Sequence, residues 1–367
     1  MRQVRARWHR PAAFCIAIAL AAAAHLLYGR LKQWGVQTPP STAILAILLG
    51  LAIGNLVSTP TWLGAGCKVI IKKWIPYAII GIGAGLDLMA LAQPSVGLAG
   101  LAITVSCMAI AFGSAVLAGR LLGLGSNAAI LLGAGTAVCG NAAVVAVAPV
   151  IGADDDDIVL SVSAVNLFGL LVTLVVPPIA LALNMSDYAG GVWAGTSVHA
   201  VPQAIAAGAA ISDAAGEFAA LFKLVRVTML APLVMLVSLA VATRKQAHSR
   251  DGSRAKAGLL RLIPWFVWGF LIAAILNSLG WLSYEVPRIP GLIPEDAGEV
   301  VSVSLTLKTI GKWILTVAMA AIGLEIRLRS LVTVGGRVIV VGFIASLALL
   351  AGSYALILMW LAPVGSQ

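Results

Sequence analysis

Long apolar stretches alternate with short polar connections along the whole chain. Most of these stretches are hydrophobic all round for 18 residues or more, the length that a helix needs to cross a bilayer core. A helix on a water-soluble domain would keep one polar face. The pattern therefore predicts an all-α integral membrane protein of about eleven transmembrane helices. The predicted spans are residues 12–29, 41–57, 74–91, 95–118, 127–151, 158–184, 191–212, 218–242, 262–280, 301–326 and 338–362.

Composition agrees with this prediction. Apolar residues make up 60% of the 367 residues and charged residues only 10%, whereas a soluble domain carries about 25% charge. We interpret residues 1–367 as one polytopic membrane domain that contacts the lipid bilayer. The first span, 12–29, could be peripheral to the internal repeats. The start also has the form of a signal peptide, but the ten spans that follow favour an uncleaved helix. The sequence leaves open whether the protein forms a homo-oligomer.

The charge distribution predicts an orientation. The net charge of +10 arises from basic loops, which are typical of the cytoplasmic side, so no nucleic-acid partner is expected. Eleven spans then place the N-terminus in the cytoplasm and the C-terminus outside. The predicted inner residues are Lys68, Lys72, Lys73, Arg120, Arg244, Lys245, Arg250, Arg254, Lys256, Arg261, Arg327, Arg329 and Arg337, and the predicted outer ones include Asp154 to Asp157, Asp213, Glu295, Asp296 and Glu299.

Two internal similarities indicate repeats. The segment IGAGLDL at 82–88 resembles IGLEI at 322–326, and AGTAVC at 134–139 resembles AGTSVH at 194–199. In the eleven-span count the first pair is oppositely oriented, as in an inverted repeat of a secondary transporter. The second pair is parallel in that count. We predict two inverted repeats with broken helices, although both similarities cannot come from one simple inverted repeat.

The segment 127–153 is rich in glycine at mid-span and predicts a broken helix. Glycine frees the backbone, and a half-helix whose N-terminus faces an anion is a common transporter device. The alternative is that small residues only allow close helix packing. Whether 127–151 spans or re-enters stays open. The candidate substrate-binding residues here are Thr136, Cys139, Gly140 and Asn141.

The segment 191–212 carries polar side chains in an apolar helix that Pro202 interrupts. His199 and Gln203 are four residues apart and share a face. An ionisable residue at this depth is often functional, so His199 is a candidate for the solute or proton path; the alternative is a hydrogen bond to a neighbouring helix. No metal site is predicted, because no second ligand lies within a turn or two. The candidates for substrate binding are Thr196, Ser197, His199 and Gln203.

Lys308 and Lys312 share one face of the segment 301–326. They are expected about 10–17 Å from the outer end of the helix, where each needs an acid, a carbonyl, water or an anionic solute. The alternative is that Lys308 snorkels outward and Lys312 pairs with a helix end. A second basic pair, Lys223 and Arg226, is predicted to be shallower. The acids within spans, all near helix ends, are Asp87, Glu217 and Glu325.

Three segments together resemble the signature regions of the YeiH-type sulfate exporter family. They are LLGAGTAVCGNAAVVAVAPVIGA, WAGTSVHAVPQAIAAGAAIS and AMAAIGLEIRLRSL, and the similarity runs from about residue 40 to the end. The resemblance implies a secondary carrier of the bacterial inner membrane, with crossed broken helices, and sulfate or another sulfur oxyanion as solute. Asn141 stands where the family commonly has alanine or serine. Ala200 stands where an acid usually follows the histidine, which questions ion coupling through this segment.

The leading hypothesis is a secondary transporter or exporter of a small anion, such as sulfate, another sulfur oxyanion or an organosulfonate. Lys308 and Lys312 would supply charge, and His199 would relay a proton. The alternatives are a cation/proton antiporter that uses Asp87 and Glu325 as coupling residues, or a channel. An enzyme and a bound cofactor are not expected, because no nucleophile–base arrangement, HExxH motif, redox ligand set or Walker loop is found.

Overall fold

The computed structural model describes residues 10–34, 40–57, 60–89, 94–245, 264–290, 292–293, 298–326 and 335–361. These form two compact units, one of residues 1–91 with 266–328 (unit 1) and one of residues 92–265 with 329–367 (unit 2). Among the described residues, six helices are long and apolar enough to cross a membrane. The predicted all-α membrane class is confirmed. The count of eleven spans is not confirmed.

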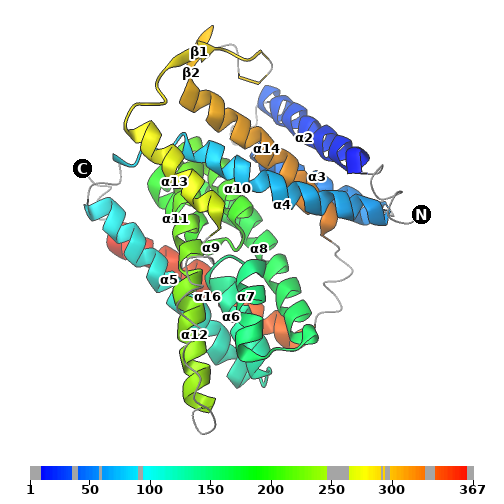
Figure 1. The fold of residues 1–367 in the computed structure, drawn as a ribbon, viewed down its shortest axis with the longest axis vertical. Helices are drawn as coiled ribbons and strands as arrows, with labels where there is room; N and C mark the ends of the chain where they lie inside the picture. The colour runs from blue at the N-terminus through cyan, green and yellow to red at the C-terminus, as the bar shows by residue number, and fades with distance from the viewer. Residues whose placement is uncertain are drawn as a thin grey trace. The chain divides into compact units, whose positions relative to one another are not determined.

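Unit 1 is built around one central helix, α14, which packs against α2, α3 and α4 (Figure 1). Two short antiparallel strands precede α14 and pair Val286 with Val301. The elements of this unit are α2 (Arg10–Gln33), α3 (Thr42–Leu56), α4 (Thr61–Gly83), α13 (Trp265–Ser278, which begins at the unit boundary), β1 (Glu285–Pro287), β2 (Val300–Ser302) and α14 (Val303–Glu325).

Glycines bring the backbones of unit 1 into direct contact. A Cβ atom on Gly81 of α4 would lie 2.7 Å from the carbonyl oxygen of Leu307, and one on Gly311 of α14 would lie 2.8 Å from that of Ala78. Gly50 and Gly323 make the same kind of contact between α3 and α14. Apolar helices in a membrane associate through such close packing of small residues.

Helix α4 begins well before the span predicted for it. Lys68, Lys72 and Lys73 therefore lie inside a helix and not in a loop, with their side chains exposed. The helix continues through them because Cys67 and Ile70, on its opposite side, are fully buried. The lysines interrupt the hydropathy of this segment but not its helical periodicity.

Unit 2 contains the remaining helices. Side-chain caps begin three of them, where Asp154, Ser186 and Ser212 each accept the backbone N–H three residues further on. The helices are α5 (Pro94–Leu121), α6 (Ser126–Ala137), α7 (Asn141–Ile151), α8 (Asp155–Ala182), α9 (Asp187–Ser197), α10 (Val201–Ile211), α11 (Asp213–Thr228), α12 (Leu230–Lys245) and α16 (Gly336–Leu361).

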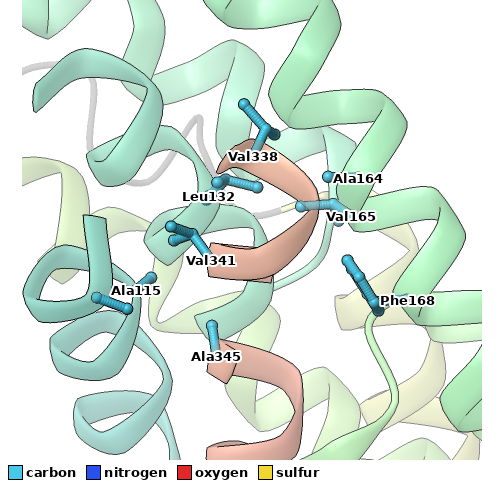
Figure 2. Packing of buried hydrophobic residues seen from close by; sticks show 9 residues of the cluster. Ala115, Leu132, Ala164, Val165, Phe168, Val338, Val341 and Ala345 are labelled. Carbon is cyan, nitrogen blue, oxygen red and sulfur yellow. The ribbon is translucent and has the colours of Figure 1, made fainter. Parts of the chain in front are cut away.

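A compact apolar cluster joins α16 to α5, α6 and α8. Val341 of α16 is fully buried beside Leu132 of α6, and Phe168 of α8 closes the cluster on one side (Figure 2). Gly342 allows this approach, since a Cβ there would lie 2.7 Å from the Phe168 ring. The cluster ties the C-terminal helix to the segments that carry the broken helices.

The two predicted broken spans are helical hairpins. A Cβ atom on Gly190, near the start of α9, would lie 3.2 Å from Cδ1 of Ile211 at the end of α10. A straight helix would separate these positions by about 30 Å. Likewise, a Cβ on Gly135 of α6 would lie 3.0 Å from Cγ2 of Val144 in α7. Each helix pair therefore turns back on itself, and neither 127–151 nor 191–212 crosses unit 2 as a straight span.

The hairpins enter unit 2 from opposite ends. The Ser161 hydroxyl of α8 donates to the Ala128 carbonyl near the start of α6 at 3.5 Å, and Val165 packs beside Gly135 near its end, so α8 runs parallel to α6. Helix α8 then crosses the unit, and α9 begins five residues after α8 ends. The hairpin α9–α10 thus starts at the far end.

The same arrangement occurs twice in unit 2. Helix α11 lies alongside α9 just as α8 lies alongside α6, with Ala215 beside Gly191 and Ala219 beside Gly195. The first arms end at Ala137 and Ser197 and the second arms begin at Asn141 and Val201, 60 residues apart in each case. The similarity of AGTAVC to AGTSVH therefore belongs to an inverted pair, which corrects the parallel orientation predicted from eleven spans.

Candidate binding site at the hairpin tips

Each hairpin breaks over three residues at its tip, 138–140 in the first and 198–200 in the second. Gly140 has φ of 73° and ψ of −127°, a conformation that favours glycine because it has no Cβ atom. Pro202 lies in the first turn of α10, where its missing N–H leaves no intrahelical bond unmade. It therefore begins a half-helix, whereas the sequence predicted that it interrupts a continuous one.

Two cations on α11 hold both tips. The Lys223 ammonium donates to the carbonyl of Val138 at 2.7 Å and to that of Val198 at 2.8 Å. These acceptors come from the first and the second hairpin respectively. One side chain therefore connects two tips that enter from opposite ends.

Arg226, one turn further along α11, repeats the connection. Its Nε donates to the Ala137 carbonyl at 2.9 Å, and its Nη2 donates to the carbonyls of Thr136 at 2.6 Å and Ala137 at 2.7 Å. Its Nη1 donates to the Thr196 carbonyl in the second hairpin. The last carbonyls of α6 and α9 have no partner within their own helices, and cations are favourable at such C-termini.

No carboxylate pairs with either cation in the described part of the chain. Both side chains are fully buried. The ion pair found among the described residues joins Lys68 to Glu325 at 3.6 Å, in unit 1. A charged group in a protein interior needs a partner of opposite charge or a set of hydrogen bonds. Here the hydrogen bonds are present and the opposite charge is not.

Two further polar groups at the second tip are buried and have no hydrogen-bond partner among the described residues. These are the hydroxyl of Ser197 and Nδ1 of His199, in side chains that are only 1% exposed. The other ring nitrogen of His199, Nε2, lies 3.2 Å from the Ser346 hydroxyl of α16. Most buried polar groups in proteins are hydrogen-bonded, so Ser197 and His199 have capacity for a ligand.

Helix α16 fixes the second hairpin through a second serine. The Thr196 hydroxyl donates to the Val192 carbonyl at 2.6 Å, so its 2.6 Å bond with Ser353 is one that Thr196 accepts. The indole N–H of Trp193 donates to the carbonyl of Leu350 at 3.0 Å. These contacts hold α9 in place beside the tip.

The two tips touch each other. A Cβ atom on Gly140 would lie 4.0 Å from the carbonyl oxygen of His199. Gln203, in the first turn of α10, packs over Gly169 of α8 together with the His199 ring. The N-termini of α7 and α10 therefore start close together, and the Asn141 side chain at the start of α7 is exposed. Helix N-termini present unpaired N–H groups and partial positive charge.

The structure brings most of the predicted site residues together in unit 2 and places the others in unit 1. Lys308 and Lys312 are half-buried on α14, and Asp87 follows the end of α4, where it accepts the N–H of Met89 at 2.8 Å. Their roles, and that of Glu325 in coupling, stay predictions. The residues gathered around the two tips are Thr136, Cys139, Gly140, Asn141, Thr196, Ser197, His199 and Gln203.

The burial of Lys223 and Arg226 and their contacts to the tips were not predicted from the sequence. The sequence indicated a shallow pair, whereas both residues are fully buried and contact the two tips. The signal that could have placed them is their position ten or more residues into the long apolar stretch that begins at Asp213. Their hydrogen-bond acceptors are backbone carbonyls, which a sequence pattern does not reveal.

A cavity of about 670 Å³ runs beside α6 between α5 and α12. Arg120 and Ser126 lie at the end where α6 begins, and Ala137 lies at the tip. Apart from Arg120 and Ser126, the residues that line the cavity are apolar. A bare inorganic anion would lose its hydration there without compensation, so we do not assign the cavity as the anion path.

Comparison with known proteins identifies a family of membrane proteins. The sequence model of a family described as "Conserved hypothetical protein 698" matches residues 13–342. A UPF0324 membrane protein of Bradyrhizobium diazoefficiens is 34% identical over 86% of this chain and 83% of its own length. One of Brucella melitensis is 32% identical over 93% of this chain and 88% of its own.

A third relative carries an individual name. The UPF0324 membrane protein TauZ of Paracoccus denitrificans is 33% identical over 80% of each chain. No solved structure matches this chain at a significant level.

Proposed function

Because the chain belongs to the UPF0324 family of membrane proteins, we propose that it is a secondary transporter that binds a small anion where its two hairpin tips meet. Membership confirms the resemblance to the YeiH-type family on which the sequence prediction rested. The solute class proposed from that resemblance is a sulfur oxyanion, such as sulfate, or an organosulfonate.

The observation that carries the proposal is the buried charge at the tips. Lys223 and Arg226 are fully buried, hydrogen-bonded to carbonyls of both hairpins, and paired with no carboxylate among the described residues. A buried cation that has hydrogen bonds but no opposite charge beside it still carries part of its desolvation penalty. An anion bound beside the two cations would supply the opposite charge.

Neutral donors around the tips suit the same ligand. The N-termini of α7 and α10 favour negative charge, and the buried hydroxyl of Ser197 has no partner in the part of the chain that the structure describes. Pairs of re-entrant or broken helices at mid-membrane are a recurrent way to bind a transported ion. Lys308 and Lys312 stay a second candidate for the positive charge.

We further propose the bacterial inner membrane as the location, with a cytoplasmic N-terminus and an outer C-terminus. Two hairpins that return to their own side leave the basic loops on the inner side, as the positive-inside rule expects. Two acidic positions change side: Asp154 to Asp157 follow the first hairpin and move to the inner side with it, and Asp187, which begins the second hairpin, moves to the outer side. The orientation of the ends is unchanged.

Thermal unfolding in detergent tests the proposal. Sulfate, thiosulfate, sulfoacetate, taurine and chloride would be compared at matched ionic strength, since a ligand of the folded state raises the unfolding temperature. We expect a shift for at least one divalent anion. Ser197→Ala should weaken that shift without loss of folding, because it removes a buried hydroxyl that has no partner.

A matched variant separates the two candidate sources of charge. If the shift survives Lys308→Ala with Lys312→Ala but not Ser197→Ala, the tips bind the anion. If the shift survives Ser197→Ala but is lost in the double lysine variant, the face of α14 that carries Lys308 and Lys312 binds the anion. No shift for any anion would favour the cation/proton antiporter, and sodium titrated against pH would follow. Saturable counterflow in vesicles distinguishes a carrier from a channel.

A further inference from the structure

From the charge at the two tips we infer that the carrier exchanges one divalent oxyanion for another and does not return across the membrane with an empty site. This inference rests on the proposed function above and adds the valence of the solute and the mode of transport. It follows from three features of unit 2: the buried cations, the half-helix ends and the polar groups that have no partner among the described residues.

The half-helix dipoles at the tips cancel. Each helix end is equivalent to about half an elementary charge, positive at an N-terminus and negative at a C-terminus. The C-termini of α6 and α9 and the N-termini of α7 and α10 all meet at the tips. Two negative and two positive ends therefore sum to about zero.

The two cations have hydrogen-bond acceptors but no opposite charge among the described residues. When both side chains are protonated, Lys223 and Arg226 give the empty site a charge of about +2, and no ion pair reduces it among the described residues. A monovalent anion would leave about +1 and a divalent anion about zero. The site therefore matches a dianion, and the Ser197 hydroxyl and Nδ1 of His199 are polar groups with no partner among the described residues.

The charge of the site determines which states can cross. A net charge in a low-dielectric interior is strongly disfavoured, whether the site itself moves or a gate closes over it. The site loaded with a dianion is neutral and avoids this penalty. The empty site keeps its charge, so its return should be slow. Transport then requires an anion in each direction.

Reconstituted vesicles test both statements. The purified protein would be placed in vesicles of phosphatidylethanolamine and phosphatidylglycerol, and uptake of radiolabelled sulfate, thiosulfate or sulfoacetate measured with and without the same anion inside. Methanesulfonate serves as a monovalent sulfonate and chloride as a monovalent inorganic anion. We expect uptake into loaded vesicles to be at least tenfold faster than into empty ones, and to favour the dianions. The comparison of sulfate with sulfoacetate separates inorganic from organic solutes.

One surface substitution changes the charge of the site without touching its buried residues. Asn141→Asp adds a negative charge at the exposed start of α7, so the ratio of dianion to monovalent exchange should fall at least tenfold. Gln33→Glu adds the same charge at the exposed end of α2 and should leave the ratio unchanged.

The outcomes separate the two proposals. Net uptake as fast as exchange, or an unchanged ratio in Asn141→Asp, would overturn the inference and leave anion transport standing. If no anion is transported and none shifts the unfolding temperature, the proposed function itself fails. Tenfold faster exchange with the charge-dependent ratio supports both.

Discussion

Lys223 donates hydrogen bonds to Val138 and Val198, two backbone carbonyls that belong to hairpins entering unit 2 from opposite ends. These valines occupy corresponding positions 60 residues apart, each immediately after the first arm of its hairpin. A single side chain on α11 therefore fixes the distance between the tips. The stability of the site should depend on the backbone geometry at those breaks.

The conformation of Gly140 gives the first prediction. Gly140→Ala should lower the temperature of unfolding in detergent, because a residue with a Cβ atom in a sparsely populated backbone region costs about 1–3 kcal/mol. Gly113→Ala in α5 is the control: a Cβ there meets no atom within 4 Å, and alanine is favoured over glycine inside a helix. Equal unfolding temperatures for Gly140→Ala and the native protein would show that the break does not need this conformation.

The hairpin α9–α10 gives a prediction that cross-linking can check. In a background without the four native cysteines, Gly190→Cys with Ile211→Cys should be joined efficiently by a short bis-maleimide, and mass spectrometry should find the linked peptide. In a straight helix these positions would be about 30 Å apart. The control pair, Ser126→Cys with Asp187→Cys, lies at opposite ends of unit 2 and should not react. Equal linkage of both pairs would contradict the hairpin.

The first hairpin changes which loops share a side of the membrane. Asp156→Cys and Leu122→Cys, both at exposed positions, should be labelled from the same side by a membrane-impermeant maleimide, because α6–α7 returns to the end where it entered. Asp187→Cys should be labelled from the other side. Eleven straight spans predict instead that Asp156 and Leu122 lie on opposite sides, so labelling of intact and inverted vesicles decides between the two topologies.

The contact between α9 and α16 gives a prediction about stability. Thr196→Val and Ser353→Ala should each destabilise the protein, because each leaves a buried partner short of a hydrogen bond. The double variant should lose less than the sum, with a coupling free energy of about 1 kcal/mol. Chemical unfolding in mixed micelles measures the four proteins of the cycle. Additive losses would mean that the 2.6 Å contact between the hydroxyls contributes nothing.

Hydropathy was sufficient to predict the long helices. The spans predicted at 158–184 and 301–326 match α8 and α14 within a few residues, because apolar length decides which segments can be helices in a bilayer. It failed for the hairpins because about 25 apolar residues fit either one straight span or two shorter arms. The glycines at 133–140 indicated a break, but the direction of the chain after the break depends on packing against α8.

The site was predicted in part, for a related reason. Thr196, Ser197 and His199 were identified because polar groups in an apolar segment are conspicuous. Lys223 and Arg226 have backbone carbonyls as their partners, and a sequence contains the same carbonyl at every position. Only the fold shows which carbonyls are free at a helix end and close enough to bind a cation.

The inverted pair of hairpins in unit 2 has a consequence for its history and its motion. A segment of about 60 residues that occurs in both orientations within one protein is what duplication of an ancestor able to insert either way round would produce. Its two copies now differ in side chains but keep one backbone plan. Exchanging the conformations of the two copies would convert a state open to one side of the membrane into a state open to the other side. One fold can therefore provide both states.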